Sequence, residues 1–174
     1  MGDELEELLT RGPVVLVEST AAGKFDSATA IVGIARSAGE VWKVATDFAS
    51  HKTFMPKLVA STPTPRGPTC IDVRFEIAIP FPGRNERYTF RYDLDPAAFT
   101  LRGRWLEGNL EDSFAIWRLV PRGDAACLLY FTTATRNFSK ILSAIEDSQQ
   151  TVTVGVNVSS ALAVVKAVKQ RVER

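Results

Sequence analysis

The stretch ATAIVGIARSAGEVWKVATDFASHKTFMPKLVASTP, residues 28–63, decides the fold. It begins as an alternating strand over residues 28–35 and continues as a helix over residues 40–48, where apolar side chains repeat at helical spacing. Ser37 stands before this helix as a cap, and a second short helical turn is predicted over residues 50–54. The sequence therefore predicts a strand that runs into two short helices.

Downstream of this stretch apolar and polar residues alternate, which is typical of half-buried strands. The alternating runs cover residues 73–79, 88–94, 99–105, 113–120 and 126–136. Strands this close in sequence pair antiparallel, because a parallel return needs a crossover of roughly a dozen residues. Three prolines predict a loop over residues 62–68. We therefore expect a meander of antiparallel strands.

The two ends of the chain add a helix each. Residues 3–10 place leucines on one helical face before Gly12 and Pro13 stop the helix, and a valine-rich strand follows at residues 14–19. We expect residues 1–25 to form an extension packed on a domain of residues 26–174. At the other end, apolar residues repeat at helical spacing over residues 161–172, and we expect one long helix from about Thr151.

Composition limits the possible functions. The chain has 174 residues, is 45% apolar and 24% charged, and carries a net charge of +1, as expected of one soluble domain without a membrane span. This charge balance argues against binding nucleic acid. Cys70 and Cys127 lie in apolar runs and are expected to be reduced, and no spacing indicates a metal or cofactor. The N-terminus lacks an apolar signal core, so we predict a cytoplasmic protein.

The order of these elements resembles the START-like superfamily, or SRPBCC, of polyketide cyclase/dehydrase and lipid transport proteins. Residues 40–61 resemble the segment that joins its first two strands, AIWRLVP at residues 115–121 resembles its Trp-x-Leu strand, and residues 161–173 resemble its last helix. The spacing from Asp47 to Pro56 is most similar to the coenzyme Q-binding branch. The resemblance implies an α+β helix-grip fold, in which a curved antiparallel sheet wraps around a long C-terminal helix and two short helices lie between the first strands.

The resemblance also implies an apolar cavity between the sheet and that helix. The residue pattern agrees with it, because the strands carry more large apolar groups than one helix can cover, and Gly155, Ser159 and Ala163 would leave space opposite them. Trp42 is expected to pack in the core. The expected ligand-binding residues are Phe54, Met55, Phe75, Ile77, Phe90, Tyr92, Trp105, Trp117, Tyr130, Val152, Val156 and Ser159.

The sequence contains few candidates for catalytic residues. His51, the one histidine, follows Asp47 by four residues, so on a continuous helix the two side chains would meet as a base and its orienting group. A surface histidine is the favoured interpretation, because no nucleophile can be placed beside the pair. Tyr130 is a second candidate for catalysis, and Arg118 a candidate for an inward-facing arginine. The arginines of the strands alternate with carboxylates, which favours a mixed charged face.

Three functions remain open at this stage. The first is binding, and possible transport or presentation, of a hydrophobic small molecule such as a lipid, a quinone or a polyketide-like compound, which needs no catalytic residue. The alternative is a polyketide cyclase or dehydratase, which requires at least two polar side chains that converge inside the cavity. A ribosome-association module, the second alternative, requires a continuous basic face, and the sequence predicts an interrupted one.

Overall fold

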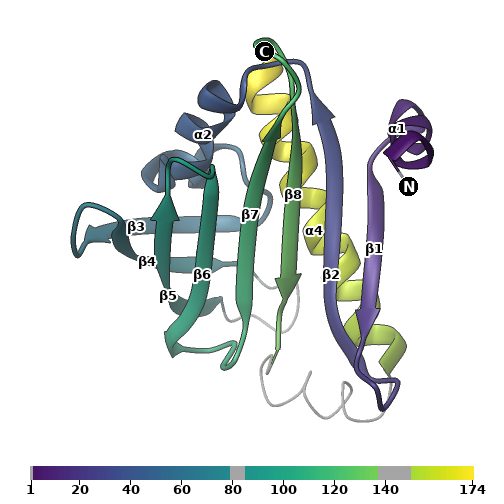
Figure 1. Cartoon of the computed structure of the whole chain (residues 1–174). Helices are drawn as coiled ribbons and strands as arrows, with labels where there is room; N and C mark the ends of the chain where they lie inside the picture. Colours follow the sequence, from purple (N-terminus) through teal and green to yellow (C-terminus); the bar gives the residue numbers. More distant parts are fainter. Residues whose placement is uncertain (1, 79–84, 137–149) are drawn as a thin grey trace.

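The computed structural model describes residues 2–78, 85–136 and 150–174, and its eight strands form one antiparallel sheet (Figure 1). The sheet order is β1-β2-β8-β7-β6-β5-β4-β3. The elements are α1 (Gly2–Arg11), β1 (Val14–Ser19), β2 (Phe25–Ile34), α2 (Ala38–Thr46), η1 (Phe48–Thr53), β3 (Leu58–Pro65), β4 (Cys70–Ile77), β5 (Glu86–Asp95), β6 (Thr100–Gly108), β7 (Phe114–Pro121), β8 (Cys127–Ala134) and α4 (Gln150–Glu173).

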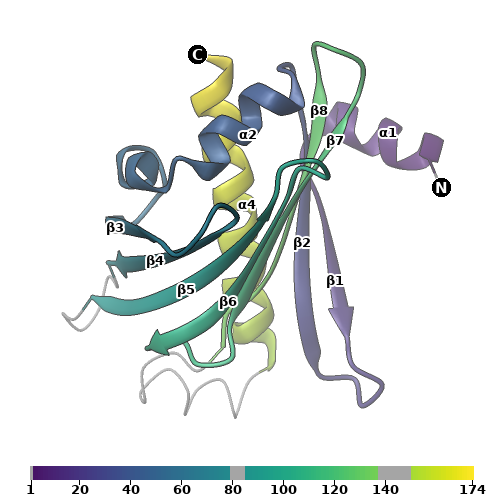
Figure 2. The ribbon, with the colours of Figure 1, turned by 60° about the vertical axis from the view of Figure 1, so that its left-hand side comes forward.

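The sheet bends around α4, which lies along its concave side (Figures 1 and 2). Strands β3 and β4 run crosswise to β2 and β8, so the two ends of the sheet approach the helix from different directions. Strands β3 to β8 pair each with the next, and β2 pairs with β8 along seven residue pairs from Ala28↔Thr133 to Ile34↔Cys127. The predicted helix-grip fold and its antiparallel meander are confirmed.

The two short helices follow β2 as predicted. The Ser37 hydroxyl accepts from the Glu40 backbone N–H and the Glu40 side chain accepts from the Ser37 N–H, which forms a capping box at the start of α2. The chain leaves the helical conformation at Asp47, with φ −79° and ψ 66°, before η1 begins. The segment is therefore two helices with a break between them.

The predicted loop over residues 62–68 is wrong in its first half, because β3 continues to Pro65. Strand β3 is an edge strand that pairs only with β4. An edge strand uses only some of its N–H groups in the ladder, so Pro63 and Pro65 fit there although they carry no N–H.

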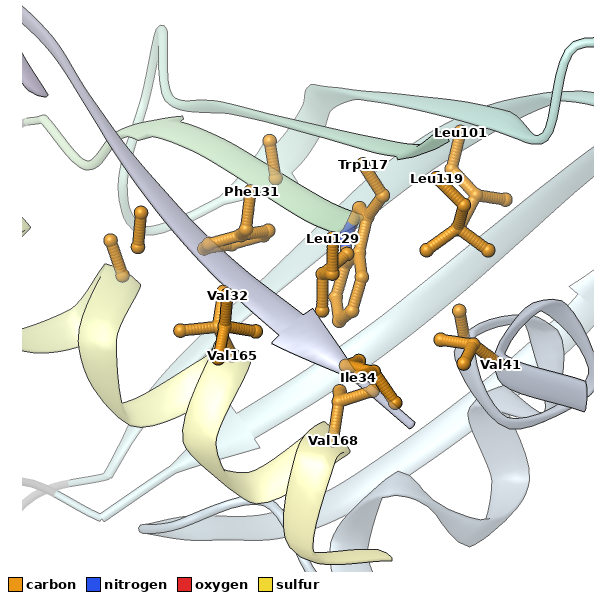
Figure 3. Packing of buried hydrophobic residues seen from close by; sticks show 14 of the residues in the cluster. Val32, Ile34, Val41, Leu101, Trp117, Leu119, Leu129, Phe131, Val165 and Val168 are labelled. Carbon is orange, nitrogen blue, oxygen red and sulfur yellow. The ribbon is translucent and has the colours of Figure 1, made fainter. Parts of the chain in front are cut away.

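The core is densest where the second half of α4 meets the sheet. Ala161, Val165 and Val168 are fully buried, and Figure 3 shows Val165 beside Val32 of β2 and Val168 beside Ile34. Helix α4 is long and apolar enough to cross a membrane by length and composition alone, and part of its apolar surface packs on β2 and β8. The predicted C-terminal helix is confirmed, and the structure describes it from Gln150 to Glu173.

The predicted N-terminal helix and strand are present as α1 and β1. Strand β1 continues the sheet by pairing with β2 from Val14↔Ile31 to Ser19↔Phe25. Arg122, in the turn between β7 and β8, forms an ion pair with Glu6 of α1 at 2.6 Å. The boundary proposed between residues 25 and 26 stays a prediction, and it falls at the start of β2.

Candidate ligand-binding cavity

A cavity of about 490 Å³ lies between the concave face of the sheet and the middle of α4, residues 156–164. Its size is that of a site for a small organic molecule. Its floor comes from β4, β5, β7 and β8, and the turn after η1 closes one side. Six residues of its wall are phenylalanine, tyrosine or tryptophan: Phe75, Tyr88, Phe90, Tyr92, Trp117 and Phe131.

Small side chains of α4 keep the cavity open. Ser159 and Ala163, one helical turn apart, line it together with Val156. Larger residues at positions 159 and 163 would extend into the space that the aromatic floor leaves. Gly155, which we expected to leave space in the same way, is exposed and does not line the cavity. The helix therefore borders the cavity between residues 156 and 164, and beyond it the buried residues Val165 and Val168 pack on the sheet.

Asn157 joins α4 to the sheet beside the cavity. Its side chain is fully buried and hydrogen-bonds the backbone of Thr135, just after β8, as a neighbouring strand would. The amide oxygen accepts from the Thr135 N–H at 2.6 Å, and the amide nitrogen donates to the Thr135 carbonyl at 3.2 Å and to the Thr153 carbonyl at 3.0 Å. These bonds fix the distance between α4 and the sheet where the cavity lies.

His51 is buried in the wall of the cavity, so its favoured interpretation as a surface residue is wrong. Its Nε2 lies 3.2 Å from the Val44 carbonyl oxygen, and because a carbonyl only accepts, Nε2 carries the hydrogen and Nδ1 keeps its lone pair. Burial lowers the pKa of His51, against the opposing effects of the Val44 and Ala45 carbonyls and of Asp47. The imidazole is therefore neutral at pH 7.

Asp47 does not orient His51. The chain breaks from the α-helix at Asp47, so the two residues are not one turn apart on a continuous helix, and the carboxylate is exposed. The imidazole contacts rings instead: Phe48 at 5.1 Å, Phe54 at 5.5 Å and Trp117 at 6.1 Å between centroids.

Tyr92 reaches across the sheet because Gly103 leaves room for it. A Cβ at Gly103, its partner on β6, would lie 2.5 Å from Cε1 and 2.8 Å from Cζ of the tyrosine ring. The ring thus covers Gly103 and points from β5 toward Trp117 on β7. Burial raises the pKa of both Tyr88 and Tyr92 far above the usual range, so both hydroxyls stay protonated.

The indole nitrogen of Trp117 has no hydrogen-bond partner in the ranges that the structure describes. The indole lies close enough to Tyr92 to oppose slightly the rise in that residue's pKa, but the two groups do not form a well-made hydrogen bond. The Trp117 ring packs edge-on against Phe131, 4.8 Å between centroids, and only 4% of the residue is exposed (Figure 3).

Eight of the twelve residues that we expected to bind a ligand line this cavity: Met55, Phe75, Ile77, Phe90, Tyr92, Trp117, Val156 and Ser159. They come from the turn after η1, from β4, β5 and β7, and from α4. That they contact a ligand stays a prediction.

The other four lie outside the cavity wall. Tyr130 alternates with Leu129 and Phe131 of the core and faces the opposite side of β8, which also removes it as a catalytic candidate. The Trp105 indole donates to the carbonyls of Gly108 and Asn109, so its ring folds over its own turn. Phe54 packs behind His51 under Arg171, and Val152 lies one turn before Val156.

Several residues of the cavity wall were not predicted from the sequence, and two of these residues are on β8. Phe131 and Thr133 point inward, one position out of phase with Tyr130. Because the sequence CLLYFTTA is apolar at both phases, alternation alone does not say which face is inward. The further residues of this kind are Pro56, Lys57, Leu58, Ala78, Tyr88, Leu110, Ala115, Thr135, Ser160 and Val164.

The outer face of the sheet carries mixed charge, as predicted. Asp72 lies between Arg91 at 2.7 Å and Arg66 at 2.6 Å, and hydrogen bonds from Arg91 and Arg66, opposed by burial, lower the pKa of Asp72 to about 2. Arg87 pairs with Glu76 at 2.9 Å. Arg118 is exposed, so it is not the inward-facing arginine that we considered.

Comparison with known proteins assigns the family. Residues 34–173 match the family model of polyketide cyclase / dehydrase and lipid transport proteins. The chain belongs to this family. Its membership agrees with the resemblance to START-like proteins, whereas the coenzyme Q-binding branch stays a prediction. No curated protein matches the chain.

Solved structures share the fold at low sequence identity. The Zhui aromatase/cyclase from Streptomyces sp. R1128 is 21% identical, with a TM-score of 0.71 over 86% of this chain and 94% of its own. A STAR-related lipid transfer protein from Xanthomonas axonopodis is 15% identical, with a TM-score of 0.71 over 94% of both chains. Norcoclaurine synthase from Thalictrum flavum, in complex with dopamine and hydroxybenzaldehyde, is 15% identical, with a TM-score of 0.56 over 95% of this chain and 91% of its own.

Proposed function

We propose that this cytoplasmic domain binds a hydrophobic small molecule, such as a lipid, a quinone or a polyketide-like compound, in the cavity under α4. The observation that carries the proposal is the aromatic floor left uncovered by the small residues Ser159 and Ala163. A fully packed core would fill this space, because protein interiors leave few voids larger than a water molecule. The family description supports this class of ligand, and norcoclaurine synthase, which has the same fold, binds small ring compounds.

The substitution Ala163→Phe tests this proposal, because its ring would occupy the cavity. We expect binding of an apolar fluorescent dye, measured by titration, to weaken by about tenfold or more, since a clash in a packed site costs upward of 1 kcal/mol. Gln170→Phe on an exposed position of α4 adds the same ring outside this cavity and serves as the matched control. Equal dye affinity in wild type and Ala163→Phe, with both folded, would contradict the proposal.

Native mass spectrometry of protein purified from its own host identifies the natural ligand class. We expect an apolar adduct that is absent from the Ala163→Phe variant. Repeated failure of the wild-type protein to retain or bind lipids, quinones or aromatic polyketides counts against the proposed function.

A polyketide cyclase or dehydratase is the second candidate, favoured by the polar groups in the wall. His51, Tyr88 and Tyr92 all line the cavity, and their protonated hydroxyls and neutral imidazole would serve to polarise a carbonyl or move a proton. Turnover of an aromatic polyketide precursor that is lost in His51→Gln or Tyr92→Phe, with binding retained, would distinguish it from a carrier. The ribosome-association module lacks such support, because carboxylates interrupt the basic outer face and pair with arginines such as Arg87 and Arg91.

A further inference from the structure

We propose that the ligand of this cavity carries a hydrogen-bond-accepting oxygen, such as the carbonyl of a flat ring compound, held between the Trp117 indole N–H and the Tyr92 hydroxyl. The inference rests on the proposed binding function and specifies its ligand. It starts from Trp117 Nε1, a buried donor that lines the cavity without a partner in the described part of the chain.

An indole N–H can only donate, and buried donors in proteins almost always have an acceptor. Packing alone does not explain the indole, because a phenylalanine would fill much of the same space against Phe131 with no polar group to satisfy. Trp105 offers the contrast: its Nε1 donates to the carbonyls of Gly108 and Asn109, 3.3 and 3.1 Å away. The Tyr92 hydroxyl lies beside Trp117 Nε1 but does not accept from it in good hydrogen-bond geometry, so we expect the acceptor in the cavity itself.

A second donor points to the same place. The Tyr92 ring crosses over Gly103, which pairs with Tyr92 on one side and with Ala115 on β7 on the other. This brings the Tyr92 hydroxyl beside the indole. An oxygen that accepts from both groups would satisfy Trp117, and a carbonyl has two lone pairs for them.

The surrounding walls favour a flat ring. Phe75, Phe90 and Phe131 present aromatic surface around the two donors, and rings bind rings through edge and offset contacts. The ligand class is thus an aromatic or polycyclic compound with a ring carbonyl, rather than a plain hydrocarbon chain.

The experiment compares two probes of nearly the same shape, 9-fluorenone and fluorene, which differ in a carbonyl oxygen. Their dissociation constants are measured by calorimetry for wild type, Trp117→Phe, Tyr92→Phe and the control Trp42→Phe. Trp42 packs on Phe99 at 5.8 Å and does not line the cavity.

We expect wild type to bind fluorenone about fivefold more tightly than fluorene, the effect of one net hydrogen bond. Trp117→Phe should bring the ratio close to one, Tyr92→Phe should reduce it, and Trp42→Phe should keep it. The ratio compares the two probes within the same variant, so a substitution that weakens both probes equally does not change it. Should Trp117→Phe fail to fold, the Tyr92→Phe ratio carries the test.

Two outcomes overturn different claims. If both probes bind and the ratio is the same in wild type and Trp117→Phe, a water satisfies the indole and the carbonyl inference is wrong, while the binding function stands. If wild type binds neither probe nor an apolar dye, the proposed function is wrong, and the inference with it.

Discussion

Gly103 is the residue on which the shape of the cavity floor depends. Glycine has no side chain, and the Tyr92 ring occupies the space that a Cβ at position 103 would fill. We expect Gly103→Ala to displace this ring, to reduce stability by about 1–3 kcal/mol through overpacking, and to weaken dye binding. Chemical denaturation and dye titration measure the two effects.

Gly33 on β2 provides the matched control for Gly103. A Cβ there would meet only Leu128 Cδ2, at an ordinary 3.9 Å. Gly33→Ala should therefore be neutral or slightly stabilising, because alanine restricts the unfolded chain more than glycine does. An equal loss of stability in both variants would show that the Tyr92 contact is not the cause.

His51 gives a second prediction at the scale of one residue. As the only histidine of the chain, it produces one set of imidazole signals in an NMR titration. We expect its pKa to lie below the ordinary 6.5, because burial penalises the charged form. A pKa at or above 6.5 would contradict its burial in the cavity wall.

The same shift makes folding stability depend on pH. Between the ordinary pKa and the lower pKa of the folded state, the unfolded chain binds more protons at His51. Its stabilising contribution is therefore complete above about pH 6.5 and is lost as the pH falls through the folded pKa, with a slope of at most about 1.4 kcal/mol per pH unit. In His51→Gln this part of the pH dependence should vanish.

At the scale of elements, the attachment of α4 to β8 depends on one amide. Asn157→Leu removes three hydrogen bonds and leaves the Thr135 backbone groups without their partner. We expect a loss of roughly 2–4 kcal/mol in the free energy of unfolding, measured by urea denaturation. Thr151→Ala, at an exposed position of the same helix, should change it by less than about 0.5 kcal/mol.

Most elements could be predicted from sequence because each has a local cause. The capping box at Ser37 and Glu40 starts α2, and alternation marks the strands from β4 onward. The prolines of β3 were misleading because edge position is a property of the assembled sheet, and no local pattern reveals it. The two short helices were predicted from sequence, but the first was expected to continue to residue 48, whereas it ends at Thr46 and the chain breaks at Asp47.

The cavity wall was predictable where only one face of a strand is apolar, as on β4 and β5. It was not predictable on β8, where Leu128, Tyr130 and Phe131 make both faces apolar and the phase is set by pairing with β2 and β7. The inward direction of His51 depends on how η1 packs against β3, which sequence spacing does not contain.

At the scale of the whole molecule, a filled cavity should stabilise the fold. A ligand that binds only the folded state adds about 2.7 kcal/mol when it is present at 100 times its dissociation constant. We expect the thermal midpoint of wild type to rise with the concentration of a bound ring ketone, as followed by calorimetry. Ala163→Phe should show a clearly smaller rise, and an equal rise in that variant would place the ligand elsewhere.

Different interactions join the two ends of helix α4 to the sheet, and this difference affects how a ligand would enter and leave the cavity. Around Val165 and Val168 it is held by buried apolar packing, and among the described residues the hydrogen bonds that join its early turns to the sheet come from Asn157. Its early turns can therefore lift while its later turns remain seated, so that loading and release need not unfold the domain. In hydrogen–deuterium exchange, amides near residue 156 should lose protection before those near residue 166.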